Sequence, residues 1–273
     1  MTALPRLPMY LAEQTWPDVA TADAGPVAFV PLGSTEQHGP HLPLSTDHTI
    51  AEGLARAAAE RTGFLCTPTV NVGVSDHHRQ FHGTMWVSPS SFRDYVEDLT
   101  RNLTYHGFDR VVFVNAHGGN EQHLQEVGRR VRADETAFAT PWMWDHAIPE
   151  LVNDIFETNG PHAGPKETAM LLHLAPETVK EAEFENARDD GLTDLANAGY
   201  SRHGARVHYD TVENAANGAF GDPTDATAEK GERIFEAACD ELVQLGEWLA
   251  EQRFANLMPR AHVDPQPGST REL

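Results

Sequence analysis

The sequence predicts an α/β protein, a three-layer α/β/α sandwich built around a mostly parallel sheet. Short apolar segments bounded by glycine or polar residues alternate with longer segments whose apolar residues recur at helical spacing. This alternation is typical of parallel strands joined by crossover helices that cover both faces of a sheet. The length of 273 residues fits one large domain. We place that domain at residues 1–257 and expect the polar, proline-containing residues 258–273 to form a flexible tail.

The elements follow one another in a regular order. The apolar run at 26–32 predicts a strand buried on both faces. Thr46 or Asp47 can cap the alanine-rich helix expected at 47–61. The pattern then repeats with a strand near 64–70, a helix near 89–106, a strand at 110–115, a helix near 121–133, a strand at 137–142, a helix near 167–173 and a terminal helix near 226–252. Residues 181–224 are rich in Asp, Asn and Gly, and predict long loops or an irregular strand pair.

Composition excludes several classes of function. The formal net charge of −21 comes from 41 acidic and 20 basic residues, and such a surface repels nucleic acid and anionic membranes. An acidic surface with three lysines resembles the surfaces of proteins from high-salt cytoplasm. We see neither a secretory signal nor an apolar run of ~18 residues, so we expect a cytoplasmic protein. The two cysteines, Cys66 and Cys239, lie too far apart for a thiolate zinc site.

Potential ligand side chains are concentrated after the first predicted strand. The segment GSTEQHGPHLPLSTDH holds Glu36, His38, His41, Asp47 and His48. In an extended segment, residues two apart face the same way, so Glu36 and His38 can present an oxygen and a nitrogen to one point. Asp47 stands at a helix start, where it can cap the helix or bridge two cations.

Two further clusters complete the set. His117 follows the strand at 110–115 within NAHGGN, and the glycines there suit either a close approach to a ligand or an ordinary turn. His162 and Glu167 flank a glycine-containing turn in GPHAGPKET; alternatively, Glu167 only offsets the dipole of the helix it begins. Ligand sites in open parallel sheets form at the carboxyl ends of strands, so the clusters can meet. Oxygen and nitrogen donors without thiolate suit Zn²⁺ first, or Mn²⁺ or Fe²⁺, and favour a pair of ions.

The strings GSTEQHGPHLPLSTD, NAHGGN, HAGPKET and FGDPTDATAEKG resemble those of the creatininase family and are spread over residues 26–232. The resemblance implies a creatininase-like α/β/α fold, a homohexamer, and a two-metal centre that hydrolyses cyclic or linear amides. By motif, Glu36, His38, Asp47 and His117 match metal ligands of that family, with Asp47 as the bridge.

The chain departs from creatininase at two positions. Gly119 stands where creatininase has a ligating glutamate, and Gly118 stands where creatininase has an aromatic substrate contact. Either Glu167 or Glu121 must then complete the second metal site, and we favour Glu167. The departures weaken creatinine as the substrate. The NAHGGN form is more similar to that of archaeal formamide hydrolases of flavin and deazaflavin biosynthesis and of the mycofactocin peptidase.

We therefore expect a metal-dependent amidohydrolase that cleaves a C–N bond of a small molecule. A hydroxide held between two divalent ions would attack the carbonyl carbon, and His162 would supply a proton to the departing nitrogen. A metal-binding protein that has lost turnover is the alternative of another class. A nucleotide-binding protein is excluded, because no glycine-rich phosphate loop follows the first strand.

Three further side chains are candidates for substrate contact. His78 lies in GVSDHHRQFHGT, a segment that resembles a family loop, and either touches substrate or packs within the loop. Trp144 and Asp145 lie in PWMWDH. They either wall a pocket for a flat ring or belong to the core.

Overall fold

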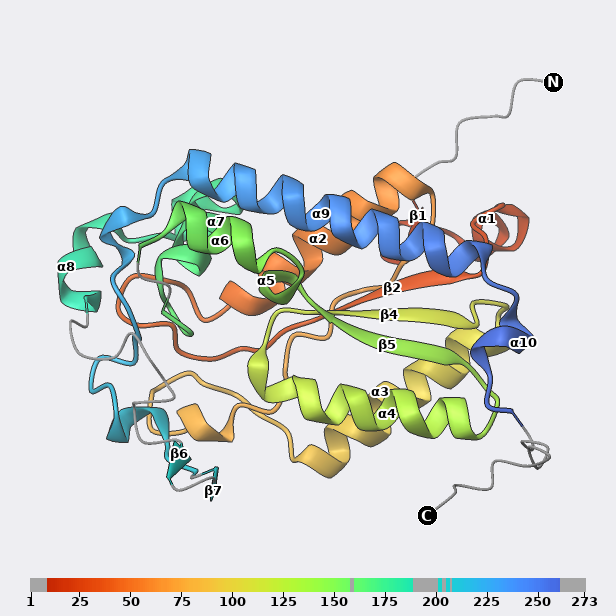
Figure 1. The fold of residues 1–273 in the computed structure, drawn as a ribbon, viewed down its shortest axis with the longest axis horizontal. Coiled ribbons are helices and arrows are strands. Elements are labelled where there is room, and N and C mark those ends of the chain that lie inside the picture. The colour runs from red at the N-terminus through yellow and green to blue at the C-terminus, as the bar shows by residue number, and fades with distance from the viewer. Residues whose placement is uncertain (1–8, 158–159, 189–200, 203–204, 207, 261–273) are drawn as a thin grey trace, which may run out of the picture.

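A computed structural model describes residues 9–157, 160–188, 201–202, 205–206 and 208–260. Its central sheet has five parallel strands in the order β1-β3-β2-β4-β5 (Figure 1). The strands are β1 (Met9–Tyr10), β2 (Val27–Leu32), β3 (Leu65–Cys66), β4 (Arg110–Asn115) and β5 (Phe138–Met143). A separate antiparallel pair joins β6 (Ser201–Arg202) to β7 (Ala205–Arg206).

Helices cover both faces of this sheet, as Figure 1 shows, and the predicted three-layer fold is confirmed. On one face lie α2 (Thr46–Thr62), α5 (Trp144–Ala147), α6 (Pro149–Ile155), α7 (Pro165–Leu174) and α9 (Ala228–Glu251). On the other face lie α3 (Pro89–Tyr105) and α4 (Glu121–Ala133). The remaining short helices are α1 (Trp16–Thr21), α8 (Phe184–Ala187) and α10 (Phe254–Leu257).

The central strands are mostly apolar because their side chains supply two cores in alternation. Phe29 of β2 packs with α2 and α9, whereas its neighbours Ala28 and Val30 pack with α3 and α4. In β4, Val112 and Phe113 divide between the two cores in the same way. The sheet is thus the buried middle layer of the molecule.

Three predicted strands differ from the structure, the first only in that β2 begins at Val27. The segment predicted at 64–70 forms a ladder only at Leu65–Cys66, and Val70 rejoins the sheet through a single bridge to Leu32. Pro68 lies between them and has no N–H to donate to a ladder. The last strand begins and ends one residue later than predicted, because its register with β4 pairs Arg110 with Phe138.

The helix predicted at 167–173 begins earlier, at Pro165, whose fixed φ suits the first helical position. The described parts of 181–224 hold short helical turns, α8 and the β6–β7 pair. The predicted tail lies outside the described residues from 261 onward. Within the described ranges, no helix has both the length and the apolar character needed to cross a bilayer.

Candidate metal centre

The strand register brings the first two ligand clusters together. Leu32, the last residue of β2, pairs with Asn115, the last residue of β4. Residues 33–45 follow β2 and lead into α2, and His117 follows β4, so both segments start from the same edge of the sheet. Gly33 makes the close turn possible, because a Cβ there would lie 2.3 Å from the backbone nitrogen of His48.

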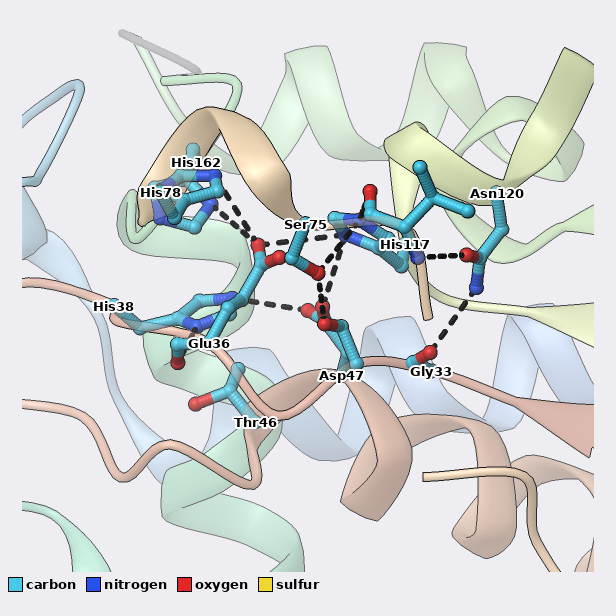
Figure 2. A network of polar contacts seen from close by, with 12 residues as sticks. Gly33, Glu36, His38, Thr46, Asp47, Ser75, His78, His117, Asn120 and His162 are labelled. Carbon is cyan, nitrogen blue, oxygen red and sulfur yellow. Dashed lines mark hydrogen bonds and ion pairs between the residues drawn. The ribbon is translucent and has the colours of Figure 1, made fainter. Parts of the chain in front are cut away.

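Asp47 lies between the two histidines of these segments (Figure 2). One carboxylate oxygen, Oδ1, is 2.9 Å from Nε2 of His38. The other oxygen, Oδ2, is 3.1 Å from Nδ1 of His117. All three side chains are buried. Each oxygen of the Asp47 carboxylate thus faces a nitrogen of a different histidine.

Glu36 faces three imidazoles with a single oxygen. Its Oε1 lies 3.3 Å from Nδ1 of His117, 3.4 Å from Nε2 of His78 and 3.7 Å from Nδ1 of His162 (Figure 2). Glu36 is only 1% exposed. Both of its carboxylate oxygens are buried without a hydrogen-bond partner among the described residues. A buried carboxylate without hydrogen bonds is costly unless positive charge lies beside it, so this group suits a bound cation.

The charges of the cluster depend on one another. Burial alone would lower the pKa of His38, but the carboxylates of Asp47, Glu167 and Glu36 together outweigh burial and raise that pKa to about 9. Burial also opposes protonation of His117, yet Glu36 and Asp47 hold its pKa well above the usual value. In turn, the neighbouring histidines outweigh burial and hold the pKa of Glu36 well below its usual value. Without metal, protons on His38 and His117 thus balance the negative charge of the carboxylates. Bound metal ions could balance the same charge in their place.

Hydrogen bonds fix which nitrogen of each ring faces the cluster. Nε2 of His117 is 3.0 Å from the carbonyl oxygen of Val74 and donates to it. Nδ1 of His38 is 3.2 Å from the carbonyl oxygen of Glu36 and donates to it. A neutral imidazole has one N–H, so the other nitrogen, which faces Asp47 in both rings, is left for a metal ion.

Glu167 reaches the cluster from the first turn of α7. One oxygen from its side chain lies within 4.8 Å of ligand atoms of His38 and His162, in one of three groups of described residues able to hold an ion. Burial raises the pKa of Glu167 to about 7. The other two groups are Glu36, Asp47 and His117, and Glu36, His78 and His162. Five expected ligands and two further histidines thus gather at one place.

Glu121, the alternative to Glu167, belongs to none of these groups. It begins α4, and its Oε1 accepts a hydrogen bond from Nε2 of Gln125. It also lines a groove of about 640 Å³, together with Trp142 of β5 and Trp248 of α9. None of the other expected metal ligands lines this groove. This placement favours Glu167 as the additional carboxylate.

The structure gives a physical reason for glycine at 119. A Cβ at that position would lie 2.4 Å from Nε2 of His117 and 2.3 Å from the carbonyl oxygen of Val74. A glutamate there would therefore clash with both the His117 ring and the Val74 carbonyl, and would disrupt the hydrogen bond between them that orients His117. At Gly118, by contrast, a Cβ would meet nothing within 4 Å.

The remaining expected residues lie elsewhere. Trp144 is 1% exposed and packs in the core beneath α9, so it offers no surface to a substrate. Asp145 forms an ion pair with the buried Lys166. Of the two alternatives predicted for Trp144, a pocket wall or a core residue, its surroundings therefore match the core residue.

Sequence reasoning missed several supporting side chains. Asn120 donates to the carbonyl oxygen of Gly33 and accepts from the backbone N–H of Val74, so it ties three segments together. Asn120 is the last residue of NAHGGN, and its place in that motif was the available signal. Ser75 lies 3.3 Å from Nε2 of His117. Gln37 contacts two of the histidines. Its place between two expected ligands was the available signal.

Comparison with known proteins gives a consistent result. Residues 12–245 match the family model described as Creatininase: Creatinine amidohydrolase. The chain is 34% identical over 244 residues to a mycofactocin precursor peptide peptidase of Mycobacterium ulcerans, covering 86% of each protein. It is 26% identical to a creatinine amidohydrolase of Pseudomonas putida, covering 84% of this chain and 92% of the relative.

Two further similarities concern other substrates and the fold. The chain is 32% identical to a 2-amino-5-formylamino-6-ribosylaminopyrimidin-4(3H)-one 5'-monophosphate deformylase of Methanothermus fervidus, over 63% of this chain and 66% of the relative. A solved structure described as creatininase with Mn superimposes with a TM-score of 0.75 at 22% identity, covering 89% of this chain and 99% of the other.

Proposed function

We propose a role for the buried carboxylates and histidines of this chain in catalysis. The chain belongs to the creatininase family of metal-dependent amidohydrolases. Its reaction is the hydrolysis of a C–N amide bond, as in the relatives. We propose that the site works with two divalent ions and acts on a small-molecule amide. The observation that carries this proposal is Asp47, which faces a ligand nitrogen with each of its two oxygens.

The donor sets suggest how two ions would be shared. Glu36, Asp47 and His117 would hold the first ion. His38, Glu167 and the second oxygen of Asp47 would hold the other, with His162 beside them. Zn²⁺ suits these oxygen and nitrogen donors best, and Mn²⁺ or Fe²⁺ also suits them. Bound cations of this kind lower the pKa of water toward neutrality and stabilise negative charge on a carbonyl oxygen.

The side chains of the protein would move the protons. Hydrolysis adds the hydroxyl of water to the carbonyl carbon, breaks the C–N bond and passes the remaining hydrogen of that water to the departing nitrogen. We propose that His162 delivers this proton, because its Nδ1 faces the cluster and its half-buried ring lies beside Glu36. His78, whose Nε2 also faces Glu36, would contact the substrate.

The relatives support different classes of amide substrate. The peptidase relative supports a short peptide, and the deformylase relative supports an N-formyl compound. Creatinine is the weaker candidate, because Gly118 offers no aromatic surface and Gly119 no carboxylate. We propose an N-formyl compound or a short peptide as the alternatives to a creatinine-like amide. A cytoplasmic location and a homohexamer also remain predictions.

A reconstitution screen tests this proposal. Metal-stripped protein is loaded with Zn²⁺, Mn²⁺ or Fe²⁺ and assayed with creatinine, N-formyl compounds and short peptides. We expect turnover of at least one class, lost on chelation and in Asp47→Asn but retained in Asp94→Asn, an exposed substitution on α3. Tight metal binding without any turnover would instead indicate a metal-binding protein.

A further inference from the structure

Gln37 lies between the expected ligands Glu36 and His38 and is 5% exposed. Its side-chain amide contacts His78, His162 and the backbone at Gly39 and Gly218. Nothing in the proposed metal chemistry requires an amide here. Its hydrogen bonds, however, involve two histidines of the site.

Two backbone groups fix the orientation of the amide. The Oε1 of Gln37 accepts from the backbone N–H of Gly39 at 2.9 Å. Its Nε2 donates to the carbonyl oxygen of Gly218 at 2.9 Å. Rotating the amide by 180° would set oxygen against oxygen and N–H against N–H, so the orientation is unambiguous. One amide hydrogen remains for a histidine.

Two histidine nitrogens compete for that hydrogen. Nδ1 of His78 is 2.7 Å from Nε2 of Gln37, and Nε2 of His162 is 2.9 Å from it. Nε2 of His162 also lies 2.8 Å from the backbone carbonyl oxygen of Gln37, which can only accept. The arrangement that satisfies every group puts a proton on Nε2 of His162, donated to that carbonyl. The remaining amide hydrogen then goes to Nδ1 of His78.

We propose that Gln37 is a positioning residue that gives the two histidines opposite roles toward Glu36. His78 accepts from the amide at Nδ1 and therefore turns an N–H, at Nε2, toward Oε1 of Glu36, 3.4 Å away. His162 donates at Nε2 and turns a bare nitrogen, Nδ1, toward the same oxygen, 3.7 Å away. One ring offers a hydrogen-bond donor to the site, and the other offers a lone pair.

This difference between His78 and His162 refines the role of each in catalysis, an inference that rests on the proposed function. The lone pair of His162 can accept a proton from water and then pass it to the departing nitrogen. The N–H of His78 can donate to a substrate oxygen. Gly218 maintains the arrangement, since it has a φ of +82° and a Cβ there would lie 1.8 Å from Oε1 of Gln37.

Nitrogen-15 NMR of histidine-labelled, zinc-loaded protein tests the proposal directly. Long-range ¹H–¹⁵N correlations distinguish the two tautomers of each neutral ring, and His78→Asn and His162→Asn assign the signals. In the parent protein we expect N–H at Nε2 of both His78 and His162. A proton at Nδ1 of His78 in the parent would overturn the proposal, whatever the enzyme's substrate.

Gln37→Glu provides a differential test. A carboxylate has no N–H to donate, so we expect the proton of His78 to move to Nδ1, while His162 keeps its bond to the backbone carbonyl. The exposed Gln244→Glu on α9 is the matched control and should change neither ring. For any identified substrate, kcat should fall about tenfold or more in Gln37→Glu with zinc content unchanged. A parent-like His78 spectrum in folded Gln37→Glu would contradict the assignment.

Discussion

At the scale of single residues, the proposed two-ion site depends on which of two carboxylates, Glu167 or Glu121, would hold the second ion. Glu167 shares a group of possible ligands with His38 and His162, whereas Glu121 faces a separate groove. We predict that Glu167→Gln lowers the bound metal from two ions toward one and reduces activity by at least about a hundredfold, because a ligand outweighs its supporting residues. Metal analysis by mass spectrometry of the purified variants measures this. Glu121→Gln is the control, and metal loss in that variant instead would contradict the ligand assignment.

The protonation of His38 predicts how the stability of the metal-free protein depends on pH. Its pKa of about 9 in the folded protein exceeds the unfolded value of about 6.5. The stability that His38 contributes is therefore fully present below about pH 6.5 and lost as pH rises through 9. His117, whose pKa is also raised, acts in the same direction.

The histidines with lowered pKa values, including His78 and His162, are neutral in both states above about pH 7 and do not oppose this change. We predict that the melting temperature of metal-stripped protein falls between pH 7 and pH 9.5, whereas zinc affinity rises over the same range as protons are displaced. Calorimetry at constant ionic strength follows both. A melting temperature that rises with pH would show that the cluster does not hold these protons.

At the scale of elements, the turn between β4 and α4 sets the direction of His117. Substitutions of the two glycines of this turn should differ in effect, because only Gly119 lies against the His117 ring and Val74. We predict that Gly119→Ala lowers metal content and the melting temperature, since the added methyl group displaces His117 from its bond to Val74. Gly118→Ala has free space and should resemble the parent in both measurements. Equal tolerance of the two substitutions would contradict the geometry described for His117.

The sequence predicted the elements that carry regular patterns and missed contacts made by irregular segments. The helix at 121–133 and the strand at 110–115 have the predicted bounds, because apolar spacing specifies both. The edge that unites Glu36, Asp47 and His117 followed from the order of parallel strands. The contacts of Gln37 could not be predicted, because they join loop residues 41, 125 and 181 positions apart in the sequence.

At the scale of the whole molecule, the net charge of −21 bears on solution behaviour rather than on the site. Repulsion between surface carboxylates weakens as salt screens it. We predict that activity and melting temperature both rise with KCl concentration above dilute buffer. Measurements of each from low to molar KCl at constant metal loading test this, and an optimum in dilute buffer would contradict adaptation to high salt.

The arrangement of the whole chain brings carboxylates and histidines from three distant segments together around Asp47, and we propose that they hold a pair of cations. A crystal structure of the zinc-loaded protein, with anomalous difference maps on both sides of the zinc absorption edge, measures this most directly. We predict two zinc peaks about 3.5–4 Å apart with Asp47 between them. A single peak, or peaks away from Glu36, Asp47 and His117, would contradict the two-ion site.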